Sequence, residues 1–303
     1  MGVYDQCARY AARSDPEAVV QRLLRSTMSN LVFVDWFDTR SLPKPDSPER
    51  IADLIAILDN SQRPNARWLI VFEFQSKPNR DKIYVLAEQS GMLLGRARYG
   101  ENKNIPWNVS GAYVHLTGRP EVARIDSTLP DGSGNRYVPL VWNLEDDDAV
   151  ETLERVADGR MSWGMLFWIP LMRRGSDLNV IGHWKELVSG LPAKRIRGDL
   201  NTVVTFFAEL AGNALVWKKQ LKGEAMTESP ILNELIRESN EETELRTVRG
   251  MLIDLLQTRF EIAIPPDVIA AIEAQPTLSM LKMWHRKAII VPSMEAFIQV
   301  LRQ

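Results

Sequence analysis

The sequence predicts an α/β fold in which a mixed β-sheet is flanked by helices and followed by a helical C-terminal region. Three observations predict it. Short apolar runs bounded by turn residues lie before residue 145, whereas helical periods dominate after Asp146. The run at 67–75 is apolar on both faces, which is typical of a central strand covered on both sides. The chain of 303 residues is 45% hydrophobic, enough for a sizeable core.

The first half of the chain is expected to hold most of the strands. A helix begins at Ser14-Asp15-Pro16-Glu17, because a capping oxygen precedes a proline and an acid in the first turn. Strands are expected at 31–37, 51–58, 67–75, 112–116 and 137–144, and a helix at 81–98. Because segment 60–65 carries a proline among polar residues, strands 51–58 and 67–75 are expected to form a hairpin with a longer loop.

Helical periods fill the second half of the chain. Helices are expected at 149–157, 199–221, 231–237, 244–260, 266–274, 278–288 and 294–301. We therefore divide the chain into an α/β core at 1–145 and a mainly helical region at 146–303. Segment 222–229, which contains a glycine and precedes Pro230, is the best linker candidate.

Composition limits the class of protein. The net charge of -2 and the isoelectric point near 6.0 argue against wholesale electrostatic binding to nucleic acid, although a local basic patch can still bind it. The single Cys7 excludes an internal disulfide, and the three scattered histidines offer no zinc cluster, so we expect a cytoplasmic protein. Neither a signal peptide nor an apolar run of about 20 residues is present, so no membrane partner is expected.

A carboxylate, Glu73, lies in the middle of the apolar strand 67–75. An unpaired buried carboxylate costs several kcal/mol, so Glu73 requires a cation, a hydrogen-bond network or a proton. Gln75 lies on the same face of the strand as Glu73, and an antiparallel hairpin would bring Asp53 beside Glu73. Two carboxylates with a free backbone carbonyl are the oxygen ligands that Mg²⁺ or Mn²⁺ prefers. Such an ion would activate water and neutralise charge on a phosphate under attack.

These residues resemble the core of the PD-(D/E)XK nuclease superfamily, in which an acid on one strand faces an acid-x-lysine pair on the next. Glu73-Phe74-Gln75-Ser76, preceded by Arg50-Ile51-Ala52-Asp53-Leu54, is similar to the branch of recombination-promoting (Rpn) nucleases, also described as YhgA-like transposases. Segments 4–10, 256–260, 264–265 and 278–284 are similar to the N-terminal segment and helical tail of that family. The resemblance spans most of the chain, and its strongest motif covers residues 50–77.

The resemblance implies a metal-dependent DNA endonuclease linked to DNA recombination or mobile elements. It implies that Asp53, Glu73 and the Phe74 carbonyl bind Mg²⁺ or Mn²⁺, with Gln75 in the position of the lysine. An amide supplies neither a base nor positive charge, so we expect Lys77 to provide the missing charge and Asp5 to be a second candidate for the site. Because double-strand cutting generally needs two active sites, a homodimer is a possible assembly.

Other interpretations of the same residues remain open. Glu73 could pair with Arg50 or Arg80, Asp53 could accept from a turn amide, and Gln75 could bind neighbouring backbone. The missing lysine is also consistent with a catalytically inactive PD-(D/E)XK-like module that binds nucleic acid or a protein partner. A structural interaction protein without affinity for nucleic acid is a third class.

Basic and acidic runs supply the remaining candidates. Basic residues cluster at Arg96, Arg98 and Lys103, at 194–197, and at Lys218, Lys219 and Lys222. The first cluster is the preferred DNA-binding candidate because it ends the helix that follows the acidic strand; the alternative for each cluster is a solvated surface. The acidic run 145–148 is interpreted as a helix cap rather than a cation site, because acids favour the positive end of the helix macrodipole.

Overall fold

The computed structural model describes residues 2–24, 30–37, 53–99, 107–119, 124–129, 131, 133–222, 230–260 and 264–301. The chain forms two compact units, Val3–Ser229 and Pro230–Gln303. The boundary between them falls at the end of the predicted linker. The helices between residues 146 and 222 thus belong to the same unit as the sheet, whereas the sequence analysis grouped them with the C-terminal helices.

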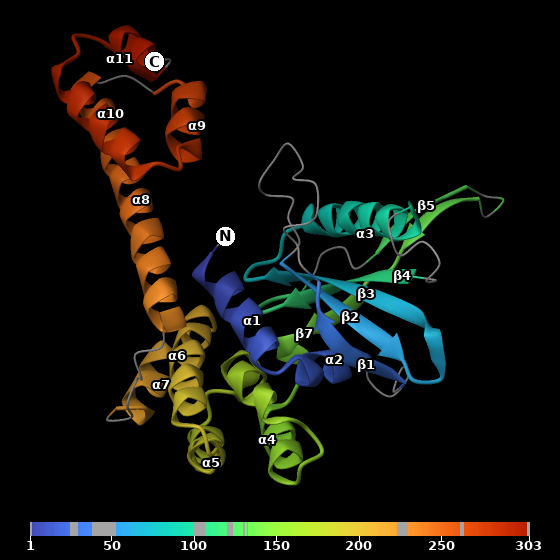
Figure 1. Cartoon of the computed structure of the whole chain (residues 1–303). Helices are drawn as coiled ribbons and strands as arrows, with labels where there is room; N and C mark the ends of the chain where they lie inside the picture. Colours follow the sequence, from blue (N-terminus) through green and yellow to red (C-terminus); the bar gives the residue numbers. More distant parts are fainter. Residues whose placement is uncertain are drawn as a thin grey trace. The chain divides into compact units, whose positions relative to one another are not determined.

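A mixed five-stranded sheet lies at the centre of the first unit (Figure 1). Its strands, in spatial order, are β1 (Leu31–Trp36), β2 (Leu54–Asn60), β3 (Arg63–Gln75), β4 (Trp107–His115) and β7 (Leu140–Asn143). The first three strands are antiparallel, and β4 and β7 continue the sheet in parallel with β3. The prediction that β3 is a central strand is confirmed.

Two features of the strands differ from the predictions. The β2–β3 connection is a tight turn at Ser61 and Gln62 instead of a longer loop, because Asn60 already pairs with Arg63. The expected strand at 137–144 is shorter, and an additional ribbon of β5 (Ile125–Thr128) and β6 (Gly134–Tyr137) precedes it.

Helices cover both faces of the sheet. On one face lies α3 (Lys82–Tyr99) (Figure 1). Its Leu86 and Leu93 belong to one buried cluster with Leu69 and Val71. On the other face, Phe74 stacks on Trp168 of the 3₁₀ helix η5 (Trp163–Leu171), and Trp168 stacks on Phe207 of α6 (Lys194–Leu210). Since successive strand residues point to opposite faces, the two-sided apolar pattern of β3 produces this three-layer arrangement.

The remaining helices of the first unit are α1 (Val3–Ser14), α2 (Pro16–Leu24), α4 (Ala149–Ala157), α5 (Leu178–Ser189) and α7 (Ala214–Gln220). Helix α4 has the predicted bounds, and Asp148 caps it by accepting hydrogen bonds from two backbone N–H groups. The expected helix at 199–221 is two helices, because Gly212 adopts a positive φ of 75° after the end of α6.

The second unit is entirely helical in its described part. It contains α8 (Pro230–Phe260), α9 (Pro266–Ala274), α10 (Leu278–Ile290) and α11 (Met294–Leu301). Its core includes Leu256, Ile272, Trp284 and Phe297. The two predicted helices at 231–237 and 244–260 are one continuous helix, α8. Within the described residues, no helix combines the length and apolar character that crossing a bilayer requires.

Candidate functional site

The two predicted acids lie opposite each other at one end of the β2–β3 hairpin. Leu54 pairs with Phe72 in the antiparallel register, so one further step along the strands places Asp53 opposite Glu73. Both residues are buried, with exposed fractions of 8% for Asp53 and 4% for Glu73. The backbone N–H of Phe74 donates to Oδ2 of Asp53 at 2.9 Å. The hairpin thus holds two carboxylates together away from solvent.

The electrostatic environment disfavours ionisation of both acids. Burial, followed by the charge of Glu73, raises the pKa of Asp53 to about 7. Burial also raises the pKa of Glu73, against the opposing effect of a nearby lysine, Lys82. Two carboxylates that share a buried site titrate as a pair and retain a proton more readily than isolated acids. A cation between them would reverse that tendency.

The cation in contact with Glu73 is Lys82, which the sequence analysis did not single out. Lys82 is the first residue of α3, and its Nζ lies 2.9 Å from Oε1 of Glu73. Of the two arginines considered as partners, Arg50 lies outside the described residues and Arg80 is exposed. The signal in the sequence was the short connection after β3, which returns the first turn of the next helix to the end of the strand.

The Gln75 side chain organises the groups beside it. Its Nε2 donates to Oε1 of Glu73 at 2.9 Å and to the carbonyl oxygen of Phe74 at 3.1 Å. The expected contact with neighbouring backbone is therefore present, together with a contact to the acid. Gln75 orients two of the three oxygen donors that the resemblance implies.

Helix α1 adds two further charges to the site. Arg9 donates from Nε to the backbone carbonyl of Asp53 at 2.7 Å. One helical turn earlier, the negative charge of Asp5 raises the pKa of both Asp53 and Glu73. Sequence reasoning named Asp5 but did not predict the helix, although the small apolar stripe of Cys7, Ala8, Ala11 and Ala12 buries one of its faces.

Strand β4 places a tyrosine and a histidine next to the site. Tyr113 pairs with Glu73, and His115 pairs with Gln75 in the parallel register. His115 is fully buried, and neither of its ring nitrogens has a hydrogen-bond partner within the described part of the chain. Burial lowers the pKa of His115 to about 4, so its imidazole is neutral at physiological pH. The sequence analysis treated this residue only as one of three scattered histidines.

The other predicted site residues lie apart from the acid pair or outside the described side chains. Lys77 follows the end of β3 and is exposed. Arg96 and Arg98 belong to the end of α3, whereas Lys82 at its start contacts Glu73; the helix axis separates these backbone positions by about 20 Å. Their side chains, and all of Lys103, fall outside the described part of the structure.

The donor set at the acid pair suits a hard divalent cation. Asp53, Glu73 and the Phe74 carbonyl offer oxygen atoms only, and burial, the largest cause of the raised pKa of both acids, would favour a bound positive charge here. Among the described residues, no cluster of three or more His, Cys, Asp and Glu side chains could hold a metal ion. A site at this position would therefore combine two carboxylates with a backbone carbonyl and water.

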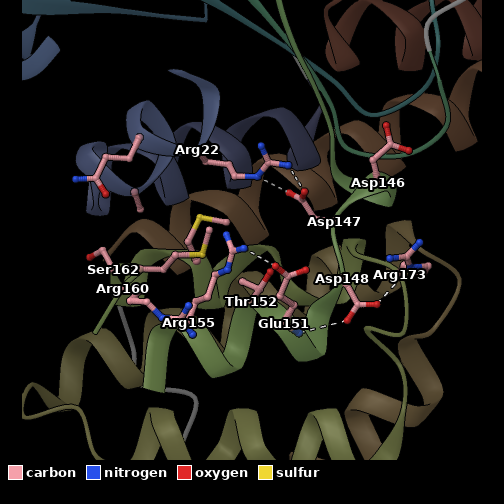
Figure 2. A pocket seen from close by; sticks show the side chains of 14 residues that line it. Arg22, Asp146, Asp147, Asp148, Glu151, Thr152, Arg155, Arg160, Ser162 and Arg173 are labelled. Atoms are coloured by element: carbon pink, nitrogen blue, oxygen red, sulfur yellow. Dashed lines mark hydrogen bonds and ion pairs between the residues drawn. The ribbon is translucent and has the colours of Figure 1, made fainter. Parts of the chain in front are cut away.

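A separate polar cavity of about 580 Å³ involves α2, α4 and η5 (Figure 2). Its charged groups compensate one another: Arg22 pairs with Asp147, Arg155 with Glu151, and Arg173 with Asp148. Trp142 also donates from Nε1 to Asp147 at 2.8 Å. Of the run 145–148, Asp148 therefore caps a helix as predicted. Asp147 and Asp146 pair with Arg22 and Arg119, and Glu145 accepts from the backbone N–H of Gly118.

Comparison with known proteins adds no assignment to this geometry. The chain matches no protein-family model, no curated protein and no solved structure. What the structure establishes is an α/β protein with a five-stranded mixed sheet, many helices and a helical C-terminal region.

Proposed function

We propose that the chain is a metal-dependent DNA endonuclease of the PD-(D/E)XK type, with Mg²⁺ or Mn²⁺ held by Asp53, Glu73 and the Phe74 carbonyl. The observation that carries this proposal is the burial of two carboxylates opposite each other with raised pKa values. When bound, the cation would supply charge for the attacked phosphate and activate water. Membership of the recombination-promoting nucleases, with a role in recombination or mobile elements, rests on the motif at residues 50–77.

The side chains around the acid pair have two further roles in this proposal: they orient the metal ligands and stabilise charge on the phosphate. Gln75 orients Glu73 and the Phe74 carbonyl through its amide hydrogens. Lys82 brings an ammonium group to the edge of the acid pair, where it can hold a phosphate oxygen and stabilise charge in the transition state. In this role Lys82 supplies what the amide of Gln75 cannot. Lys77, on the exposed segment after β3, is the second candidate for that charge.

A plasmid-nicking assay tests the activity. Supercoiled DNA is incubated with Mg²⁺ or Mn²⁺ and with the parent, Asp53→Asn or Glu73→Gln. We expect both variants to lose at least ~100-fold in rate because each removes an oxygen charge that holds the cation. Asp59→Asn is the matched control, since Asp59 lies at the other end of β2 in an ion pair with Arg67. Equal nicking by all four proteins would identify a contaminating nuclease and remove the support for this site.

Metal binding has a readout independent of cleavage. Without DNA, Mn²⁺ should raise the melting temperature of the parent and leave that of Asp53→Asn unchanged, because a ligand that binds only the folded state stabilises it. No shift in the parent at millimolar Mn²⁺ would contradict the metal site. Salt-sensitive DNA binding without metal binding or cleavage would favour the inactive nucleic-acid-binding module.

A further inference from the structure

Arginines on α1 extend outward from the acid pair. Arg9 is anchored to Asp53 by its 2.7 Å hydrogen bond, and Arg13 follows one helical turn later on the same side of the helix. Arg13 is exposed, yet partial burial and the adjacent charge of Arg9 lower its pKa. The guanidinium groups of Arg9 and Arg13 therefore repel each other, and Arg9 lies directly beside the candidate metal ligand Asp53.

The first turn of α6 places a third arginine beside an acid that α1 also contacts. The hydroxyl of Tyr10 donates to Oδ2 of Asp199 at 2.6 Å, and Nε of Arg195 lies 3.7 Å from that same oxygen. Tyr10 lies between Arg9 and Arg13 along α1, which packs against α6. The Arg195 side chain is 69% exposed, so its other guanidinium donors face solvent.

The start of α6 is electrostatically unusual. Lys194 and Arg195 occupy its first turn, and the cap residue Ala193 has no polar side chain to accept from the first backbone N–H groups. Cations at the N-terminus of a helix oppose the positive end of the macrodipole, which costs a few tenths of a kcal/mol or more. An anion beside this turn would relieve that cost and the repulsion between Arg9 and Arg13.

We propose that Arg9, Arg13 and Arg195, the α1–α6 arginine patch, bind the phosphodiester backbone of DNA next to the bond that the acid pair cleaves. This inference rests on the proposed function, because DNA is the partner that the proposed metal site at the acid pair would act on. The rise along α1 from Arg9 to Arg13 is about 6 Å, which is close to two successive phosphate steps of ~3.4 Å along the axis of one strand of B-DNA. Guanidinium groups bind phosphates by paired hydrogen bonds.

The patch changes which surface is expected to face the DNA. Phosphate contacts position a protein on its duplex and carry no direct sequence information, so binding through this patch is tolerant of sequence. Such a patch would let a chain with a net charge of -2 bind a polyanion, because two helices far apart in the sequence, α1 and α6, each supply arginines where they pack together.

Fluorescence anisotropy with a labelled 20-base-pair duplex tests the patch in the full chain. Binding is measured in EDTA across a series of salt concentrations, so that cleavage does not interfere. Arg13→Ala and Arg195→Ala should each weaken binding about 3- to 10-fold and reduce the slope of log affinity against log salt by about 1. Arg195→Lys, which keeps the charge but loses the paired hydrogen bonds, should recover part of the affinity. Arg124→Ala, at the exposed residue that precedes β5 and lies outside the patch, is the matched control and should bind as the parent does.

The outcomes separate the patch from the nuclease proposal. Equal affinity and equal salt slope in the parent and an Arg13→Ala, Arg195→Ala double variant would overturn the patch, as would the absence of duplex binding by the parent at low salt. Patch-dependent binding by a parent that does not nick plasmid would support the patch and overturn the enzyme. Melting temperatures verify folding, and the exposed Arg13→Glu, expected to weaken binding more than Arg13→Ala, serves as the test if Arg195→Ala does not fold.

Discussion

Two groups of acids in the first unit differ in what surrounds them. Asp148, at the separate cavity, accepts from two backbone N–H groups and pairs with two arginines, and its hydrogen bond to Arg174 is the main reason that its pKa falls to about 2. Asp53 is buried opposite a second carboxylate, and its pKa rises to about 7. Acids that are fully bonded hold the fold together, whereas acids kept in a costly environment are candidates for function.

The largest difference is expected in plasmid nicking when the cation beside each group of acids is removed: Lys82 beside Glu73 and Arg173 beside Asp148. Lys82→Ala should reduce plasmid nicking about 100- to 1000-fold, because the charge next to the attacked phosphate is lost. Lys82→Arg should restore part of the rate. Arg173→Ala removes a cation from Asp148 and should leave nicking unchanged. If Lys77→Ala lost activity while Lys82→Ala kept it, the charge would belong to Lys77.

A pH series sharpens the comparison through stability. The folded pKa of Asp53 is above its ordinary value of 3.8, so ionised Asp53 destabilises the fold above about pH 7, and this cost disappears as pH falls toward 4. Asp53→Asn should therefore be more stable than the parent at pH 8, by on the order of a few kcal/mol, and the difference should shrink at pH 5.

Urea unfolding of the two proteins in metal-free buffer at several pH values measures this difference. Asp148→Asn provides the contrast, because the pKa of Asp148 is lowered from its ordinary value of 3.8. Ionised Asp148 therefore stabilises the fold above about pH 4, and this stabilisation is lost as the pH falls toward 2. A parent more stable than Asp53→Asn at pH 8 would show that the Asp53 carboxylate is compensated and would weaken the metal proposal.

The smallest effect is expected at the helix cap, where Asp148 also pairs with two exposed arginines. Asp148→Ala removes the acceptor for the N–H groups of Val150 and Glu151, and should destabilise the first unit by about 1–2 kcal/mol. Asp148→Ser, which keeps a capping oxygen, should recover part of the loss. The free energy of unfolding measures both changes. A cap variant as stable as the parent would mean that the two acid groups differ less than their contacts indicate.

Much of the architecture was predictable because its determinants are local. The bounds 149–157, 266–274 and 294–301 agree with α4, α9 and α11, since each helix has a local start signal: Asp148 caps α4, Pro266 opens α9, and Ser293 accepts from the N–H of Ala296 in α11. The approach of Asp53 to Glu73 was also predictable, because consecutive strands joined by a short connection pair with each other. The ribbon β5–β6 was missed, since its exposed residues lack the alternation of a half-buried strand.

Local patterns are thus enough to define the central strand, most helices and the two acids at the end of the hairpin. Tertiary packing decides which charges join them. Lys82 reaches Glu73 because a helix folds back over the strand, and Arg195 reaches the α1 surface through a contact between Tyr10 and Asp199. The physical reason is that side-chain periodicity reports which face is buried, whereas the electrostatic environment of a buried acid depends on elements that only the folded chain brings within a few ångströms.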